Sequence, residues 1–163
     1  MKHLIIGIFL ILSQIGLSQQ VTNGFSMPES ITSNGERFFV SNQGQDFINK
    51  DGDGFISEIS AEGKILTHKF LPLKGLLNAP KGMTIVNNIL FVADLDRVVG
   101  YNIKNRKTVF ELVIDEAKLL NDICELENGF IAVTETVSGN IYKINIDKKT
   151  FEIIYTMIVN LKF

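Results

Sequence analysis

The sequence predicts an all-β protein, and three observations support this fold class. A segment of one type occurs three times, as MPESITSNGERFFVSN, APKGMTIVNNILFVAD and LLNDICELENGFIAVTE. These segments are rich in Val, Ile and Phe and alternate with period two, as half-buried strands do. Beyond the N-terminal region, no stretch sustains a helical period. Each segment therefore reads as a strand, a turn and a second, more apolar strand.

The three segments align along their whole length, with one extra residue in the third. The alignment makes Ser30, Gly82 and Asp122 equivalent. It also places polar side chains at the end of each second strand, at Asn42, Asp94 and Glu135. An Asn, Asp or Glu at such a position commonly bonds backbone amides in the following turn, which is the role we expect for these three.

Each segment continues into two further strand-like runs, so every unit has four strands. The runs are FISEIS and KILTHKF, then VVGYNI and KTVFELVI, then NIYKINI and FEIIYTM. Turns such as SNG, NN, ENG and EGK separate the strands. Four short strands repeated every roughly 40 to 50 residues are typical of β-propeller blades. The predicted blades cover residues 27–70, 77–114 and 119–157.

The N-terminus has the pattern of a secretory signal peptide. It begins with the basic residue Lys2, continues into an apolar run, and has the small residues Gly16 and Ser18 before the expected cleavage site. The run is shorter than the roughly 20 apolar residues of a membrane-spanning helix. We therefore expect residues 1–18 to be removed. Residues 19–163 would then be a periplasmic or secreted partial propeller domain with no membrane span.

The composition argues against three features: a nucleic-acid partner, an intrachain disulfide and a zinc site made of several histidines. A net charge of −2 is too mild to imply a nucleic-acid partner. The only cysteine, Cys124, cannot form an intrachain disulfide, and its apolar surroundings predict a core position. Beyond the signal peptide His68 is the only histidine, which excludes a zinc site made of several histidines.

The number of blades needs an explanation. The chain supplies about three, whereas closed propellers usually have about 4 to 8. Either the sequence is the N-terminal part of a longer propeller, or copies associate through their open blade edges. We favour the first explanation, a partial six-bladed propeller.

Three stretches resemble a known family. They are VSNQGQDFINKDGDGFISEISAEGK, GLLNAPKGMTIVNNILFVADLDRVVGYN, and AKLLNDICELENGFIAVTET with SGNIYKI after it. They are similar to the extracytoplasmic branch of the gluconolactonase and senescence-marker-protein propellers, which shade into NHL-repeat proteins. The resemblance covers nearly the whole chain after the signal peptide. It implies six blades around a channel, where the lactonases of the family hold one divalent cation through Glu, Asn and Asp from separate blades.

The resemblance also implies site residues. Glu29 looks like the family's glutamate ligand and Asn121 like its asparagine, so both would bind a divalent metal such as calcium. The second blade offers Lys81, facing the channel, which is not a ligand type. The aspartate of a later blade has no counterpart; Asp122 would have to replace it, although neighbours on a regular strand point to opposite faces.

Such a metal would polarise an ester or lactone carbonyl, with Glu29 or Asp122 as the catalytic base. The alternative is that Glu29, Lys81 and Asn121 only cap strand starts and line a solvated channel mouth.

The stretch NKDGDGFIS allows two interpretations. Asn49, Asp51 and Asp53 alternate as the ligands of a calcium loop do, with Gly54 at the bend. An EF-hand is excluded, because Ser60 stands where its bidentate acid is required and the flanks are strand-like. A calcium loop within a β-hairpin and a plain Asp-Gly turn both remain open.

Three functions follow from these observations. The first is an exported propeller that binds a small molecule, glycan or protein at its channel face. The second is a metal-dependent lactonase or esterase of the gluconolactonase type. The third is a truncated relic without activity.

Overall fold

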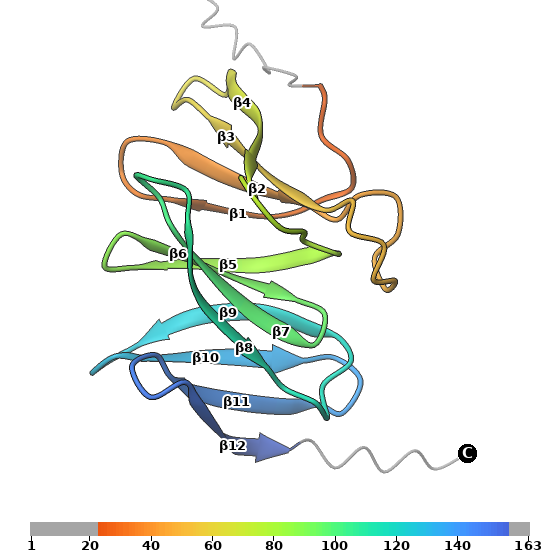
Figure 1. Ribbon diagram of the computed structural model, residues 1–163, viewed down its shortest axis with the longest axis vertical. Helices are drawn as coiled ribbons and strands as arrows, with labels where there is room; N and C mark the ends of the chain where they lie inside the picture. The colour runs from red at the N-terminus through yellow and green to blue at the C-terminus, as the bar shows by residue number, and fades with distance from the viewer. Residues whose placement is uncertain (1–22, 157–163) are drawn as a thin grey trace, which may run out of the picture.

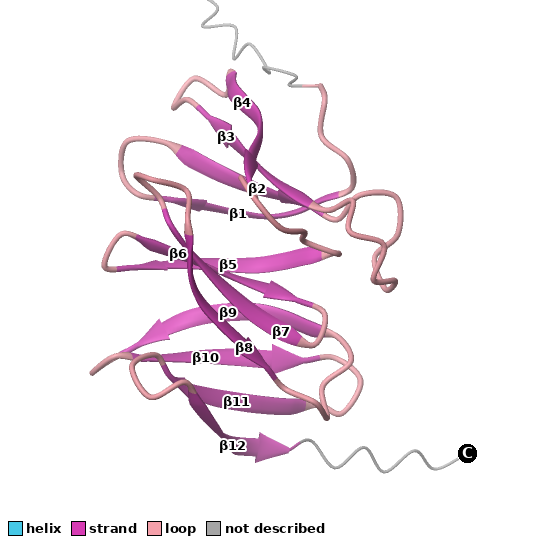
Figure 2. Ribbon diagram, in the orientation of Figure 1, coloured by secondary structure: helices cyan, strands magenta, loops and turns pink. Residues whose placement is uncertain are grey.

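The computed structural model describes residues 23–156, which fold into strands and turns without a helix (Figures 1 and 2). Within this range, accordingly, no helix is long and apolar enough to cross a membrane. The predicted signal peptide, residues 1–18, lies outside the described residues. So does Met157, the predicted last residue of the third unit.

The strands form three four-stranded antiparallel sheets, which confirms the all-β class and the three four-stranded units. Each sheet is a simple meander, in the orders β1-β2-β3-β4, β5-β6-β7-β8 and β9-β10-β11-β12. The first sheet comprises β1 (Pro28–Ser33), β2 (Phe38–Asn42), β3 (Phe55–Ile59) and β4 (Ile65–Leu71). The second comprises β5 (Pro80–Val86), β6 (Ile89–Asp94), β7 (Arg97–Asn102) and β8 (Thr108–Val113). The third comprises β9 (Leu120–Leu126), β10 (Phe130–Glu135), β11 (Asn140–Asn145) and β12 (Thr150–Thr156).

Asparagine and glycine close the hairpins at the predicted turns. Asn87 and Asn88 form the two-residue turn between β5 and β6, with φ of 49° and 64°. Asn128 and Gly129 close the β9–β10 hairpin with φ of 62° and 78°. Asn and Gly adopt this left-handed region at lower cost than other residues, so the turns follow directly from the sequence.

The first strand of every sheet carries a bulge at the same place. Pro28 pairs with Asn42 but Ile31 with Val40, so two residues of β1 face one residue of β2. The same shift occurs in β5 between Pro80 and Met83, and in β9 between Leu120 and Ile123. A bulge bends the strand and re-aims its side chains. The three units are thus alike in detail as well as in strand order.

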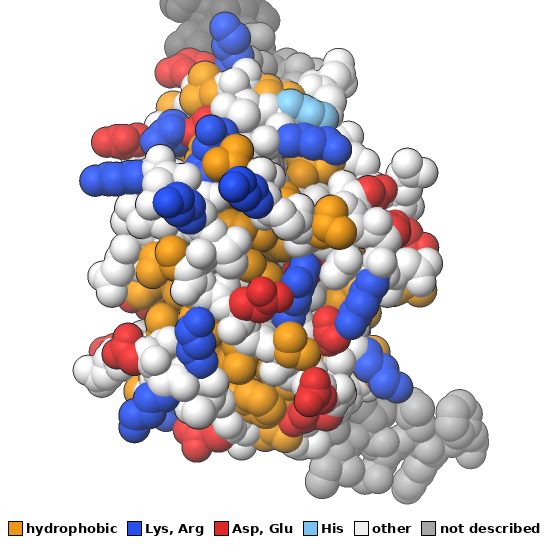
Figure 3. Space-filling view, viewed as in Figure 1, with side chains coloured by type: hydrophobic (Ala, Val, Ile, Leu, Met, Phe, Trp, Pro, Cys, Tyr) orange, Lys and Arg blue, Asp and Glu red, His pale blue; other side chains and the backbone are white. Residues whose placement is uncertain are grey.

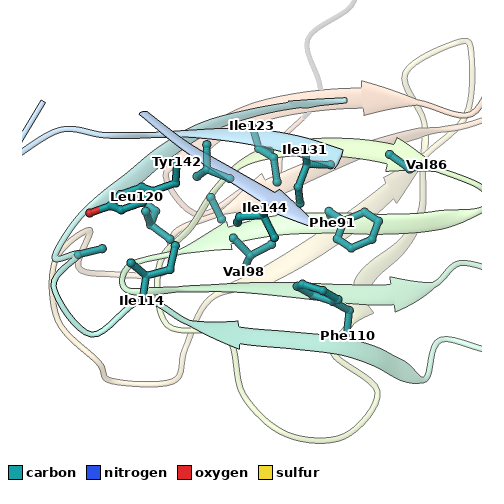
Figure 4. Packing of buried hydrophobic residues seen from close by; sticks show 13 residues of the cluster. Val86, Phe91, Val98, Phe110, Ile114, Leu120, Ile123, Ile131, Tyr142 and Ile144 are labelled. Carbon is teal, nitrogen blue, oxygen red and sulfur yellow. The ribbon is translucent and has the colours of Figure 1, made fainter. Parts of the chain in front are cut away.

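Two apolar layers hold the sheets together. In β6, Val92 packs toward the first sheet and its neighbour Phe91 toward the third, as the alternation of a strand requires. Figure 4 shows the layer between the second and third sheets, with side chains from β6, β8, β10 and β11 meeting between them. The second sheet is therefore buried on both faces.

Among residues 23–156, other strands cover only one face of the third sheet. Ile123 in β9 is buried against the second sheet, whereas its neighbour Cys124 is exposed on the opposite face. The prediction that Cys124 is a core residue was therefore wrong. An apolar run in the sequence does not reveal which of its faces another sheet will cover.

Candidate functional site

The bulges of the three first strands bring predicted site residues together. Strand β5 packs against both β1 and β9, so Lys81 stands between Glu29 and the pair Asn121 and Asp122. A Cβ added to Gly82 would lie 2.7 Å from the carbonyl oxygen of Asn121 and 2.8 Å from Oδ1 of Asp122. The bulges of β5 and β9 are therefore in direct contact, and glycine is the residue that permits it.

Three of these side chains form a charged cluster. Glu29 is exposed, yet partial desolvation raises its pKa above the ordinary value; Lys81 acts against this change and Asp122 adds to it. Burial lowers the pKa of Lys81, against the charges of Glu29 and Asp94. Glu29 thus lies near one positive charge, Lys81, and one negative charge, Asp122.

Lys81 is almost entirely buried, at 3% exposed. Its Nζ donates a hydrogen bond to the carbonyl oxygen of Phe47, 3.1 Å away, and lies 5.8 Å from the centre of the Phe47 ring. Phe47 belongs to the long β2–β3 loop, which is also tied to the second sheet by an ion pair of 2.5 Å from Lys50 to Asp96. Lys81 therefore fixes this loop beside Glu29.

Asn121 and Asp122 lie inside the bulge of β9. The side-chain amide of Asn121 donates to Oγ1 of Thr136 at 3.0 Å, and Oδ1 of Asp122 accepts from the backbone N–H of Ile123 at 2.8 Å. Because a bulge interrupts the regular alternation, the expectation that these two neighbours point to opposite faces does not apply here.

The predicted calcium loop is held by local turns. The Asn49 amide donates to Asp46 Oδ2 at 2.6 Å, the Asp53 N–H donates to Asp51 Oδ1 at 3.2 Å, and Asp53 Oδ2 accepts from the Gln45 N–H at 3.0 Å. These bonds agree with the plain-turn interpretation. One oxygen, Asp53 Oδ1, is buried without a hydrogen-bond donor among the described residues.

Metal binding at either place stays a prediction. Across residues 23–156, no group of three or more His, Cys, Asp or Glu side chains is arranged to hold a metal ion. Around β5, Glu29 and Asp122 supply two carboxylates, but the ammonium of Lys81 lies close to Glu29. The described residues alone do not complete a ligand set for a divalent cation.

Asn42, Asp94 and Glu135 accept hydrogen bonds from backbone amides, as the sequence predicted. The difference is that these amides lie before the first strand of each sheet, and only Glu135 also bonds the following turn. All three side chains are buried and accept hydrogen bonds from backbone amides. The bonds run from Ser26 N to Asn42 Oδ1, from Ala79 N to Asp94 Oδ1 and from Leu119 N to Glu135 Oε1, each 2.9 Å long. These amides precede the first strand of each sheet. The side chains therefore fasten the start of each sheet, and Glu135 also accepts bonds from Ser138 in the following turn.

Sequence reasoning missed two residues of the loop that Lys81 fixes. Phe47 and Ile48 are adjacent apolar side chains that are 50% and 55% exposed. The available signal was an aromatic and a branched residue inside the otherwise polar stretch QGQDFINKDGDG. No family model and no curated protein matches this chain.

Proposed function

We propose that the chain is an exported binding protein whose three sheets are consecutive blades of a β-propeller. Three features support the architecture: each sheet is a four-stranded meander, the chain passes from the last strand of one sheet to the first strand of the next, and the first strands pack together. Blades joined in this way are typical of propellers.

The ligand would bind where β1, β5 and β9 begin. The observation that carries this proposal is the repeated bulge, which gathers Glu29, Lys81 and Asp122 beside the exposed Phe47. A few convergent polar groups next to an aromatic ring are typical of small-molecule sites. Carboxylates accept hydrogen bonds from hydroxyl groups, and an aromatic ring packs on the apolar side of a sugar. We therefore propose a small polyhydroxylated molecule or a glycan as the ligand.

Ligand-observed NMR with a panel of mono- and oligosaccharides tests this proposal. We expect Glu29→Gln to weaken binding of any sugar that the wild type binds by about tenfold, the equivalent of ~1.4 kcal/mol. Glu36→Gln is the matched control, because Glu36 is exposed in the β1–β2 turn, at the opposite end of β1. Equal binding by wild type and Glu29→Gln would refute the site.

A metal-dependent lactonase or esterase is the second candidate, and one observation favours it. The pKa of Glu29 is raised toward neutral pH, which is the direction that favours general acid–base catalysis by a carboxyl group. The same variants decide between the candidates when sugar-lactone hydrolysis is measured with and without added calcium. Calcium-dependent turnover that is lost in Glu29→Gln but kept in Glu36→Gln would establish the enzyme, whereas binding without turnover would establish the binding protein.

A further inference from the structure

A hollow lies between the β4–β5 connection and the β7–β8 turn. Its volume is about 370 Å³, and its lining residues are Leu73, Lys74, Arg106, Lys107 and Thr108. Figure 3 shows Lys and Arg side chains gathered over the upper left of this face, where Figure 1 draws the β7–β8 turn. No part of the candidate site described above contributes to this hollow.

The positive charge of the hollow is not neutralised locally. No Asp or Glu lines it, and the ion pairs among residues 23–156 leave Lys74, Arg106 and Lys107 without an acidic partner. Three like charges around one concave surface repel each other and produce a local positive potential. This potential stands out on a chain whose net charge is −2.

Arg106 is held in place more firmly than an ordinary surface cation. Its guanidinium carbon lies 5.6 Å from the ring centre of the buried Phe70. Its backbone has φ of 58°, unusual for a residue other than glycine, and its N–H donates to the carbonyl oxygen of Asn102 at 2.8 Å. A guanidinium fixed on an aromatic face offers its planar fork for two parallel hydrogen bonds to an oxyanion.

Leu73 gives the hollow an apolar side, because its side chain is 52% exposed. We propose that the hollow binds an organic oxyanion, whose charged head contacts Arg106, Lys107 and Lys74 and whose apolar body packs on Leu73. This proposal does not rest on the function proposed above, and each can fail without the other.

The test is a titration of the full chain with phenyl phosphate at low ionic strength. Binding is measured by isothermal titration calorimetry and by NMR shifts of the backbone amides. Inorganic phosphate and phenol serve as probes of the head and the body alone. We expect phenyl phosphate to bind about tenfold or more tightly than either, with the largest shifts at residues 73–74 and 106–108. Arg106→Gln should weaken binding about tenfold, and Arg106→Lys less, since the ammonium keeps the charge but loses the fork.

Lys64→Gln is the control for a general charge effect, because Lys64 is an exposed cation in the β3–β4 turn. Equal loss of affinity in Arg106→Gln and Lys64→Gln would overturn the proposal. So would equal binding of phenyl phosphate and inorganic phosphate, or no binding of phenyl phosphate. If circular dichroism shows that Arg106→Gln is unfolded, Lys107→Gln provides the same comparison.

Discussion

Asp94 shows at the scale of one residue how a buried charge is accommodated. The side chain is completely buried. Oδ1 accepts from the backbone amides of Asn78 and Ala79, each at 2.9 Å, and Oδ2 accepts from Nε and Nη2 of Arg97 at 3.0 and 2.8 Å. Burial still raises the pKa of Asp94, although Arg97 and the two amides act in the opposite direction. The effect of desolvation on the pKa is therefore larger than the combined effect of Arg97 and the two amides, which is common for buried ion pairs.

Removing this carboxylate should nevertheless destabilise the protein strongly. Asp94→Ala leaves the buried amide of Ala79 and the half-buried amide of Asn78 without their acceptor and removes two of the hydrogen bonds of the Arg97 guanidinium. We expect a loss of about 3–5 kcal/mol in the free energy of unfolding, measured by urea denaturation. Glu111→Gln is the control, because it removes only the exposed partner of Arg97, 2.8 Å away. That change should cost less than about 1 kcal/mol. Similar losses for both variants would contradict the role assigned to Asp94.

At the scale of strands and turns, most of the fold was predictable from local sequence. Period-two alternation located all the described strands, and the Asn and Gly positions located the hairpin turns. The bulges were not predictable, because their residues are polar or glycine (Glu29-Ser30, Lys81-Gly82 and Asn121-Asp122) and show no apolar alternation from which the register could be inferred. Nor was the bond from Lys81 to Phe47, since no local rule connects residues so far apart in the chain.

The contact between two bulges provides a test at this scale. In Gly82→Ala, the new Cβ would lie 2.7 Å from the carbonyl oxygen of Asn121 and from Cα of Asp122. Backbone atoms cannot rotate away as a side chain does, so we expect a loss of about 1–3 kcal/mol in urea denaturation. Ser30→Ala, at the equivalent position of β1, should change stability by less than about 0.5 kcal/mol. An unchanged midpoint for Gly82→Ala would show that the two strands are further apart.

For the whole molecule, the outer face of the third sheet differs from the inner layers. In the second sheet, Gly100 pairs with Phe110, and both lie in the layer that packs on the third sheet. At the matching place in the third sheet, Lys143 pairs with Glu152, forming an ion pair of 3.2 Å. Lys143 also lies 4.4 Å from the ring centre of Phe130. Any further sheet packed there would have to bury this ion pair, a less favourable contact than the apolar layers.

The edge of this sheet, which β12 forms among residues 23–156, offers a different route to association. Strand β12 is an edge strand, and its consecutive residues Ile153, Ile154 and Tyr155 are 47%, 50% and 55% exposed. Apolar edge strands tend to pair with another chain. We expect the average mass in analytical ultracentrifugation to rise with concentration, and Ile154→Lys to suppress the rise.

Leu66→Lys is the control, since Leu66 is 50% exposed on β4, the edge of the first sheet. A protein that stays monomeric at every concentration would rule out association through β12. Equal suppression by the two substitutions would show that β12 is not the preferred edge.

The repeated bulge separates chemistry from architecture. On either side of it the strand pairings correspond in all three sheets, while the first residue inside it is Glu29, Lys81 or Asn121. Side chains at these positions take no part in the backbone hydrogen bonds between the strands. The same backbone conformation therefore occurs with an acid, a base and an amide at this position. At the proposed site, Glu29 and Asn121 could therefore be exchanged to alter a ligand preference without changing the strand pairings, whereas Lys81 also holds the β2–β3 loop.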